Sequence, residues 1–316
     1  MIRKGKGMQT DSPSPTGPAE RTIPKTGAQI IVTDIKDLAR TTYEAFHIAS
    51  TGRPGPVLID VPADLQFQKH SSNGPVRLNL PGYRVPKNGH ARQINEAAQA
   101  INRSERPVLL AGGGVITANA SQELRNLASK ANLPVAMTLM GLGSFDQCRP
   151  ESLDMPGMHG APYANYAIQE CDLLIAAGAR FDDRVTGKVE TFAPKAKIVH
   201  IDIDPSNISK TVPADIPLVG DARVVLAALA ECVEHRQREA WFARIADWKR
   251  QYAVNYDRSA SSLKPQHVIE ELYRRTEGKP CVVDFHVDAE ENVFPIVPAG
   301  KGLHEMEGLH MLQNTM

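Results

Sequence analysis

The 316-residue sequence has no excess charge of either sign and no long apolar run. Its 36 Lys and Arg residues balance 36 Asp and Glu residues, so nothing favours binding to nucleic acid or to an anionic membrane surface. No stretch of about eighteen apolar residues occurs, which argues against a transmembrane helix. Residues 1–27 are polar and lack the apolar segment of a secretory signal, and Asp11 and Glu20 disfavour a transit peptide. We therefore predict a cytoplasmic protein without nucleic-acid or membrane partners.

Cysteine is scarce, and the four cysteines lie far apart in the sequence. Cys148, Cys171, Cys232 and Cys281 form no C-x-x-C pair, which excludes a zinc ribbon and a thioredoxin motif. We expect reduced thiols that are mostly buried as small apolar residues.

Motifs of self-contained catalysis are absent as well. The sequence has no serine in a G-x-S-x-G context, no H-E-x-x-H and no P-loop. Their absence favours a protein that works through a bound cofactor.

From residue 90 onward, short apolar runs alternate regularly with amphipathic segments. This alternation predicts an α/β fold with a doubly wound parallel sheet. The predicted helices cover residues 94–101, 121–131, 161–170, 221–231 and 238–256, and the predicted strands cover residues 107–111, 134–137, 172–176 and 197–203.

Shorter segments flank this region. A helix is predicted at 34–50, capped by Asp34, then a strand at 57–61 and a proline-rich linker; a helix at 265–275 and a strand at 280–287 follow the central region. The predicted domains are a disordered tail (1–32), a first flanking segment (33–89), the central domain (90–260) and a last flanking segment (261–316). The last flanking segment, with one helix, one strand and a tail, has too few elements to bury a core of its own.

Two successive predicted strands end in charged residues. The segment GARFDDRVTG (178–187) follows one apolar run, and HIDIDP (200–205) ends the next. In an open parallel sheet the carboxyl ends of the strands form the ligand crevice, so this pattern predicts a nucleotide-type ligand. Asp202 and Asp204 suit the hydroxyl groups of a ribose. Arg180 and Arg184 suit a phosphate or a carbonyl-rich ring, although a surface ion-pair cluster with Asp182 and Asp183 is the alternative.

Three further segments add weaker signals. The loop LLAGGGV (109–115) would let a backbone approach a pyrophosphate, or would simply form a tight turn, because it is not G-x-G-x-x-G. Asp221 suits either an adenosine contact or a helix N-cap. The segment MPGMHG (155–160) would suit a flat ring, and its His159 is more often structural than catalytic.

These segments together resemble the catalytic subunits of the acetolactate synthase (acetohydroxyacid synthase) family of thiamine-diphosphate enzymes, over about residues 33–307. TGRPGPVLIDVP (51–62) resembles the end of the family's pyrimidine-binding domain. LMGLGSF (139–145), PGMHG (156–160), residues 178–187 and residues 200–219 resemble its central FAD-binding domain. PQHVIEEL (265–272) resembles the start of the diphosphate-binding domain, and VDAEENVFPIVP (287–298) resembles the C-terminus.

The resemblance implies a Rossmann-like central domain that binds FAD without consuming it. It also implies decarboxylation of pyruvate and addition of the two-carbon unit to pyruvate or 2-oxobutyrate, in branched-chain amino-acid synthesis. Carried over motif by motif, the FAD-binding positions are Arg53, Gly112, Gly113, Thr138, Leu139, Met140, Gly157, Met158, His159, Gly178, Arg180, Asp182, Arg184, Asp202, Ile203 and Asp221.

The resemblance further implies thiamine diphosphate and Mg²⁺, whose sites we expect to be absent here. The family's catalytic glutamate has no counterpart before Val32, and no Gly-Asp-Gly motif occurs anywhere. We therefore predict no catalytic and no metal-binding residues, and an incomplete catalytic subunit that binds FAD but is inactive alone. By family, it would form a homo-oligomer or bind a regulatory small subunit. The alternatives are a stand-alone, non-catalytic FAD- or nucleotide-binding module, another α/β ligand such as NAD or CoA, and a product without function.

Overall fold

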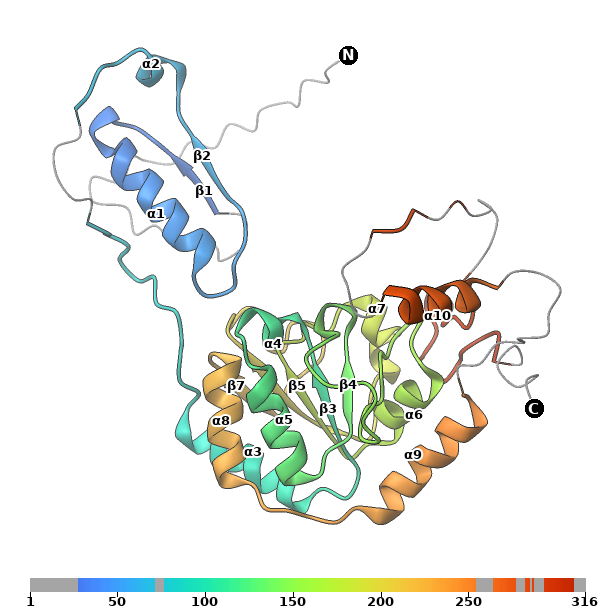
Figure 1. Ribbon diagram of the computed structural model, residues 1–316. Coiled ribbons are helices and arrows are strands. Elements are labelled where there is room, and N and C mark those ends of the chain that lie inside the picture. The colour runs from blue at the N-terminus through green and yellow to red at the C-terminus, as the bar shows by residue number, and fades with distance from the viewer. Residues whose placement is uncertain are drawn as a thin grey trace. The chain divides into compact units, whose positions relative to one another are not determined.

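The computed structural model describes residues 28–71, 77–253, 264–276, 282–284, 286 and 293–309. The chain divides into two compact units, Met1–Val85 and Pro86–Met316 (Figure 1).

The larger unit is built on a five-stranded parallel sheet with the strand order β4-β3-β5-β6-β7. Every residue of β3 and β5 is buried, as expected for parallel strands that are covered on both faces. The predicted α/β fold with a parallel sheet is confirmed. The strands are β3 (Pro107–Ala111), β4 (Val135–Met137), β5 (Leu173–Ala177), β6 (Lys197–Asp202) and β7 (Ile216–Val219).

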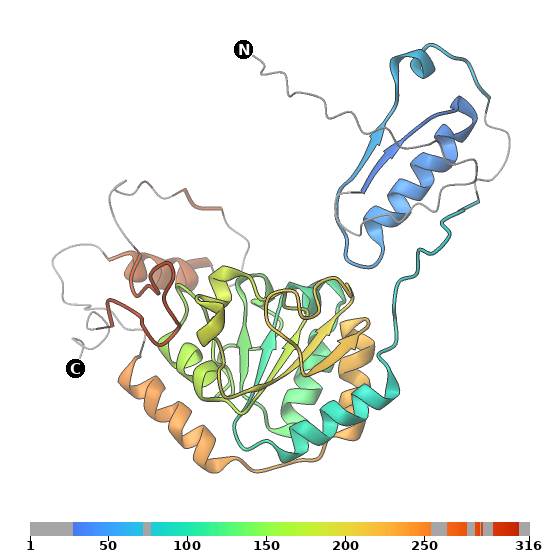
Figure 2. The same ribbon diagram turned by 180° about the vertical axis from the view of Figure 1, so that it is seen from behind.

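Helices cover both faces of this sheet (Figures 1 and 2). Side chains of one strand alternate between the faces, so Leu109 packs on one side and Leu110 on the other. The first face carries α3 (Ala91–Arg103), α5 (Ser121–Ala131) and α8 (Ala222–Cys232), and the second carries α6 (Pro162–Glu170) and α9 (Glu239–Gln251). Two short helices, α4 (Gly113–Thr117) and α7 (Asp183–Thr186), lie where the chain leaves β3 and β5.

The smaller unit contains a parallel pair of strands, β1 (Ala28–Ile31) and β2 (Val57–Asp60), joined by η1 (Ile35–Asp37) and α1 (Leu38–Ser50). Asp34 caps η1 by accepting a bond from the backbone of Lys36, as predicted. Residues 28–31 were assigned to the disordered tail, but they form β1. The reason is tertiary: Ala28 and Ile30 are buried with Ala45 and Ile48 of α1. The proline-rich segment after β2 also contains a short helix, α2 (Ala63–Gln66).

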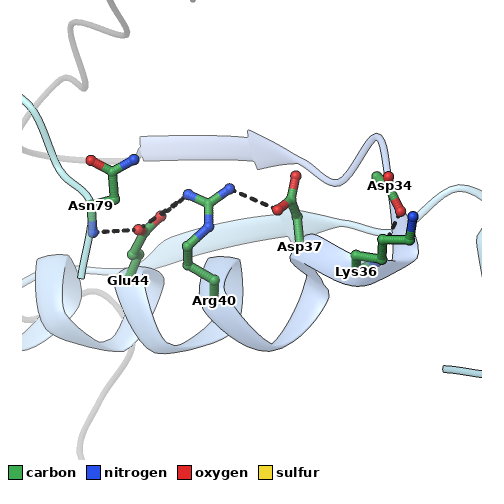
Figure 3. Close-up of polar contacts among 6 residues, drawn as sticks. All are labelled: Asp34, Lys36, Asp37, Arg40, Glu44 and Asn79. Atoms are coloured by element: carbon green, nitrogen blue, oxygen red, sulfur yellow. Dashed lines mark hydrogen bonds and ion pairs between the residues drawn. The ribbon is translucent and has the colours of Figure 1, made fainter. Parts of the chain in front are cut away.

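A buried carboxylate on α1 connects this helix to the segment that follows residue 77 (Figure 3). Glu44 Oε1 accepts a bond from the backbone nitrogen of Asn79 at 2.8 Å, and it lies 3.3 Å from Arg40 Nη1. Arg40 also pairs with Asp37 at 2.9 Å. The segment after residue 77 is therefore held against α1.

Some elements differ from the sequence prediction. Strand β7 was missed because it contains Pro217, which is tolerated there because β7 is an edge strand. Helix α9 ends at Gln251, and the predicted residues 254–256 lie outside the described part. Helix α10 (Pro265–Thr276) forms where predicted. Residues 282–284 and 286 of the predicted strand 280–287 are not in a strand, and its other residues are not described.

The expectation that the cysteines are mostly buried is wrong for two of the three in the described segments. Cys171 is buried, but Cys148 and Cys232 are exposed. Cys148 lies in the turns after β4, and Cys232 is the last residue of α8, where its Sγ lies 3.8 Å from Asn95 Oδ1. Cys281 lies outside the described residues. Within those residues, no helix has the length and apolar character needed to span a bilayer.

Candidate cofactor-binding site

The strand order sets a switch point between β3 and β5. From β3 the chain crosses to β4 on one side, and it then returns to β5 on the other side. Ligands of open α/β sheets bind outside the carboxyl ends of the strands at such a point. The loops that begin at Gly112 and Gly178 both leave the sheet there, beside α4 and α7 (Figure 1).

Glycines allow these two loops to cross in direct contact. The backbone nitrogen of Gly114 donates to the carbonyl oxygen of Gly178 at 3.0 Å. A Cβ atom on Gly112 would lie 2.2 Å from that same oxygen, and one on Gly114 would lie 2.6 Å from Gly178 Cα. Gly178 itself has φ +60°, a conformation that glycine adopts without strain. Gly112 and Gly114 therefore serve the crossing itself, as in the tight-turn alternative, whereas Gly113 faces the loop after β4.

That third loop presents apolar side chains to solvent. The backbone nitrogen of Thr138 donates to Ala111 at 2.9 Å, which fixes the loop to the end of β3. Leu139 and Met140 follow, with 67% and 74% of their surfaces exposed. A Cβ atom on Gly113 would lie 3.0 Å from Met140 Cβ. Exposed apolar side chains beside a bare backbone suit a flat ring.

In the arginine–aspartate segment after β5, only some of the charged groups form ion pairs or hydrogen bonds. Arg180 Nη2 lies 3.0 Å from Asp182 Oδ2, and 61% of the Arg180 side chain is exposed. Asp182 Oδ1 is buried and has no hydrogen-bond partner among the described residues. Arg184 is exposed, and its Nη1 lies 3.2 Å from Met158 Sδ. Two guanidinium groups are thus available to an anionic ligand.

The PGMHG segment is packed against α7. Gly157 has φ +109°, and the backbone nitrogen of Met158 donates to the carbonyl oxygen of Arg184 at 2.8 Å. His159 is exposed. Met158 and Arg184 therefore lie side by side, which the sequence pattern did not show.

The acidic side chains at the end of β6 accept hydrogen bonds from the loop that follows this strand. Asp202 is 7% exposed; it accepts bonds from the backbone nitrogen of Asp204 at 2.8 Å and from Asn207 Nδ2 at 3.2 Å. Burial raises the pKa of Asp202 above its ordinary value. Burial also lowers the pKa of His200, whose Nε2 lies 2.8 Å from the carbonyl oxygen of Ala179. Ile203 is half-buried.

Two predicted residues take clear structural positions. Asp221 is the N-cap of α8 and accepts bonds from the backbone nitrogens of Arg223 and Val224 at 2.9 and 3.4 Å, so the N-cap alternative is confirmed. Arg53 is half-buried in the turn between α1 and β2 of the smaller unit.

The predicted site residues of the larger unit lie near the carboxyl ends of the parallel strands. The residues of the PGMHG segment are the exception, because they contact this region through α7. Exposed apolar side chains and two arginines suit a long cofactor with a ring and phosphates. The buried Asp182 Oδ1, which has no hydrogen-bond partner among the described residues, suits a hydroxyl or N–H donor. Sequence reasoning missed Gly141, where a Cβ atom would lie 2.3 Å from the carbonyl oxygen of Ala111. It also missed Asn165, a buried polar residue without a motif. In the described residues, no group of three or more His, Cys, Asp or Glu side chains could hold a metal ion.

Comparison with known proteins agrees with the α/β fold of the larger unit. Residues 94–229 match the model of the thiamine pyrophosphate enzyme central domain. The chain is 46% identical over 257 residues to the acetolactate synthase large subunit of Corynebacterium glutamicum, covering 79% of this chain and 41% of that protein. It is 48% identical over 245 residues to the probable acetolactate synthase large subunit of Methanocaldococcus jannaschii (75% and 41%). The corresponding values for the large subunit of Haemophilus influenzae are 42% over 260 residues (80% and 45%).

The chain therefore spans about two fifths of the length of the curated relatives that it matches. The matched family region contains all five strands of the sheet and the three loops that converge at the switch point. Residues 94–229 thus match a thiamine pyrophosphate enzyme central domain, and the chain is similar over most of its own length to acetolactate synthase large subunits.

Proposed function

We propose that the carboxyl edge of the five-stranded sheet binds FAD. The observation that carries this proposal is the meeting of three loops at the switch point, where an open glycine backbone, exposed apolar side chains and exposed arginines lie together. Leu139 and Met140 would contact the ring, and Gly113, Arg180 and Arg184 would approach the phosphates. The backbone at Asp202 and Ile203 would face the adenosine end.

We further propose that the chain is part of an acetolactate synthase large subunit. The reaction would decarboxylate one pyruvate and join the remaining two-carbon unit to a second 2-oxo acid. This overall reaction transfers no electrons to a flavin, so bound FAD would remain oxidised and would support the architecture of the site. A cytoplasmic location, a homo-oligomer or a regulatory small subunit, and thiamine diphosphate with Mg²⁺ belong to the same proposal.

The 316 residues as they stand are proposed to bind FAD without forming acetolactate. The support is the sequence itself, which contains no Gly-Asp-Gly motif to hold Mg²⁺ and a diphosphate. The absence of this motif also supports the second candidate function, a non-catalytic flavin-binding module. Such a module would bind FAD in the same way but would have no role in the reaction.

An absorbance spectrum of the purified chain, followed by titration with FAD, tests the binding proposal. Flavin absorbance near one equivalent, or saturable quenching of flavin fluorescence, is the expected result. NAD and CoA at the same concentrations serve as controls, and tighter binding of either would overturn the choice of FAD. An assay with pyruvate, thiamine diphosphate and Mg²⁺ then tests the second part, because acetolactate formed by the chain alone would contradict it.

A further inference from the structure

Asn165 is a fully buried polar residue that no sequence motif singled out. It lies in the first half of α6 with 0% of its surface exposed, and it faces the loop of residues 155–160. An amide side chain is costly to bury unless its donors and acceptor are all engaged.

Both ends of the Asn165 amide contact Gly157. Its Oδ1 accepts a bond from the backbone nitrogen of Gly157 at 2.8 Å, and its Nδ2 donates to the carbonyl oxygen of Gly157 at 3.0 Å. The second hydrogen of Nδ2 points to Met306 Sδ at 3.2 Å. The Gly157 N–H fixes which amide atom is oxygen, because Nδ2 in that place would oppose donor to donor. Asn165 therefore holds Gly157 by its donor and its acceptor at once.

The backbone of Gly157 has an unusual conformation that neighbouring groups must keep in place. Its φ of +109° lies where side chains are strained, and a Cβ atom there would lie 2.3 Å from the carbonyl oxygen of Arg184. The next residue, Met158, donates its backbone N–H to that same oxygen. The position of the loop therefore decides where Met158 and Arg184 meet.

A segment near the C-terminus closes the other side of this loop. The backbone nitrogen of Val297 donates to the carbonyl oxygen of Met158 at 2.8 Å, and Ile296 pairs with Glu307 in an antiparallel bridge. Val297 and Leu303 are buried in the same apolar cluster as α6 and α9. Met306 thus approaches Asn165 from a segment that is itself anchored, at the dark red end of the chain in Figure 2.

We propose that Asn165 is a positioning residue that fixes the loop of residues 155–160, and with it Met158 and Arg184, for the bound cofactor. Met306 orients the amide. This inference rests on the proposed binding of FAD. It requires a side chain that both donates to and accepts from the backbone of one residue, Gly157, so a carboxylate cannot replace the amide but a neutral carboxyl group can.

The test compares Asn165→Ala and Asn165→Asp with the matched control Gln169→Met, one turn further along α6. Gln169 is also buried, and its Nε2 has no hydrogen-bond partner among the described residues, so its replacement should leave the loop unchanged. FAD affinity is measured at pH 7.5 and pH 5.5, each relative to wild type at the same pH.

Asn165→Ala should weaken FAD binding by about tenfold at both pH values, the loss of roughly one good hydrogen bond to the loop. Asn165→Asp should bind at least as weakly at pH 7.5, because the carboxylate opposes the carbonyl of Gly157. At pH 5.5 its affinity should recover toward wild type, since a buried carboxyl group takes up its proton readily. A defect in Asn165→Asp that is equal at both pH values would overturn the proposal.

Amide hydrogen exchange in the FAD-free chain provides a readout that does not depend on the cofactor. Exchange at Gly157 and Met158 should accelerate in Asn165→Ala and stay at the wild-type rate in Gln169→Met. Unchanged exchange in Asn165→Ala would overturn the positioning role. A wild-type chain that binds no FAD would overturn the proposed function, while the exchange result would still decide whether Asn165 fixes the loop.

Discussion

Gly112 and Gly178 are far apart in the sequence, yet a Cβ atom on Gly112 would lie 2.2 Å from the carbonyl oxygen of Gly178. The two loops that leave β3 and β5 touch through their backbones at this point. The switch point is therefore a contact between two main chains, and the candidate cofactor site is built around that contact.

Gly112→Ala should lower the free energy of unfolding by at least about 2 kcal/mol, because the new methyl group overlaps a carbonyl oxygen that belongs to the backbone. Gly113→Ala is the matched control, since its Cβ atom would lie 3.0 Å from the Cβ atom of exposed Met140 and no closer than 3.4 Å to a carbonyl oxygen, that of Met140. Urea unfolding of both variants measures the difference. Equal losses in the two variants would contradict the crossing as the cause.

Arg180→Ala should weaken FAD binding by about tenfold and leave the unfolding free energy within about 0.5 kcal/mol of wild type. The guanidinium group is mostly exposed and, within the described residues, pairs only with Asp182; such surface pairs contribute little to stability. Arg244→Ala is the control, because Arg244 is similarly exposed and pairs with Glu170 on the second face of the sheet. Titration at two salt concentrations should show a weaker salt dependence in Arg180→Ala. If Arg244→Ala has the same effect, Arg180 has no special role.

Arg238 caps the ends of two helices from within the protein. It is 5% exposed and donates to the carbonyl oxygens of Ile101 near the end of α3 and of Ala131 at the end of α5. Burial lowers the pKa of Arg238 to about 10, so it stays charged at neutral pH. Arg238→Ala should cost about 3 kcal/mol, since several carbonyl groups lose their donor inside the protein.

The exposed Arg250 provides the control for Arg238→Ala. It forms an ion pair with Asp247 on the surface of α9, so Arg250→Ala should change the midpoint of thermal unfolding by no more than about 1 °C. A comparable shift in the two variants would show that the buried guanidinium group contributes little.

Acidification should destabilise the chain through His200. Burial lowers the pKa of His200, so between its ordinary value and that lower value the unfolded chain binds a proton that the folded chain does not. Stability is therefore lost as the pH falls below about 6.5, by up to about 1.4 kcal/mol at pH 5.5. The raised pKa of Asp202 acts in the opposite direction, because the folded chain holds that proton more tightly than the unfolded chain does.

The measurement is urea unfolding at pH 7.5 and pH 5.5 for the wild type and for His200→Gln, whose amide can still donate to Ala179. The variant should lose less stability over this interval than the wild type. An identical loss in both chains would show that His200 does not account for the pH dependence.

Most helices and strands of the larger unit were predicted because each carries its own local signal. The five-residue strand β3 and the helix α5 have the predicted bounds, since one is continuously apolar and the other has a clear helical period. Strand β1 was missed because four residues carry too little pattern, and β7 was missed because proline argues against a strand until its place at the edge is known.

The fold class, and the edge of the sheet at which the polar residues gather, could both be predicted from the amino-acid pattern. Both follow from periodicity and from polar residues that come directly after apolar runs, and parallel strands align those ends without further information. The role of each residue at this edge depends on contacts that form in the folded chain. The tertiary structure shows that Gly112 and Gly178 serve a backbone crossing, that Asp221 caps a helix, and that Asn165 holds Gly157. The contact between the loops at Gly112 and Gly178 and the contact between Met306 and Asn165 each join segments that are distant in the chain. No local sequence pattern could therefore have predicted them.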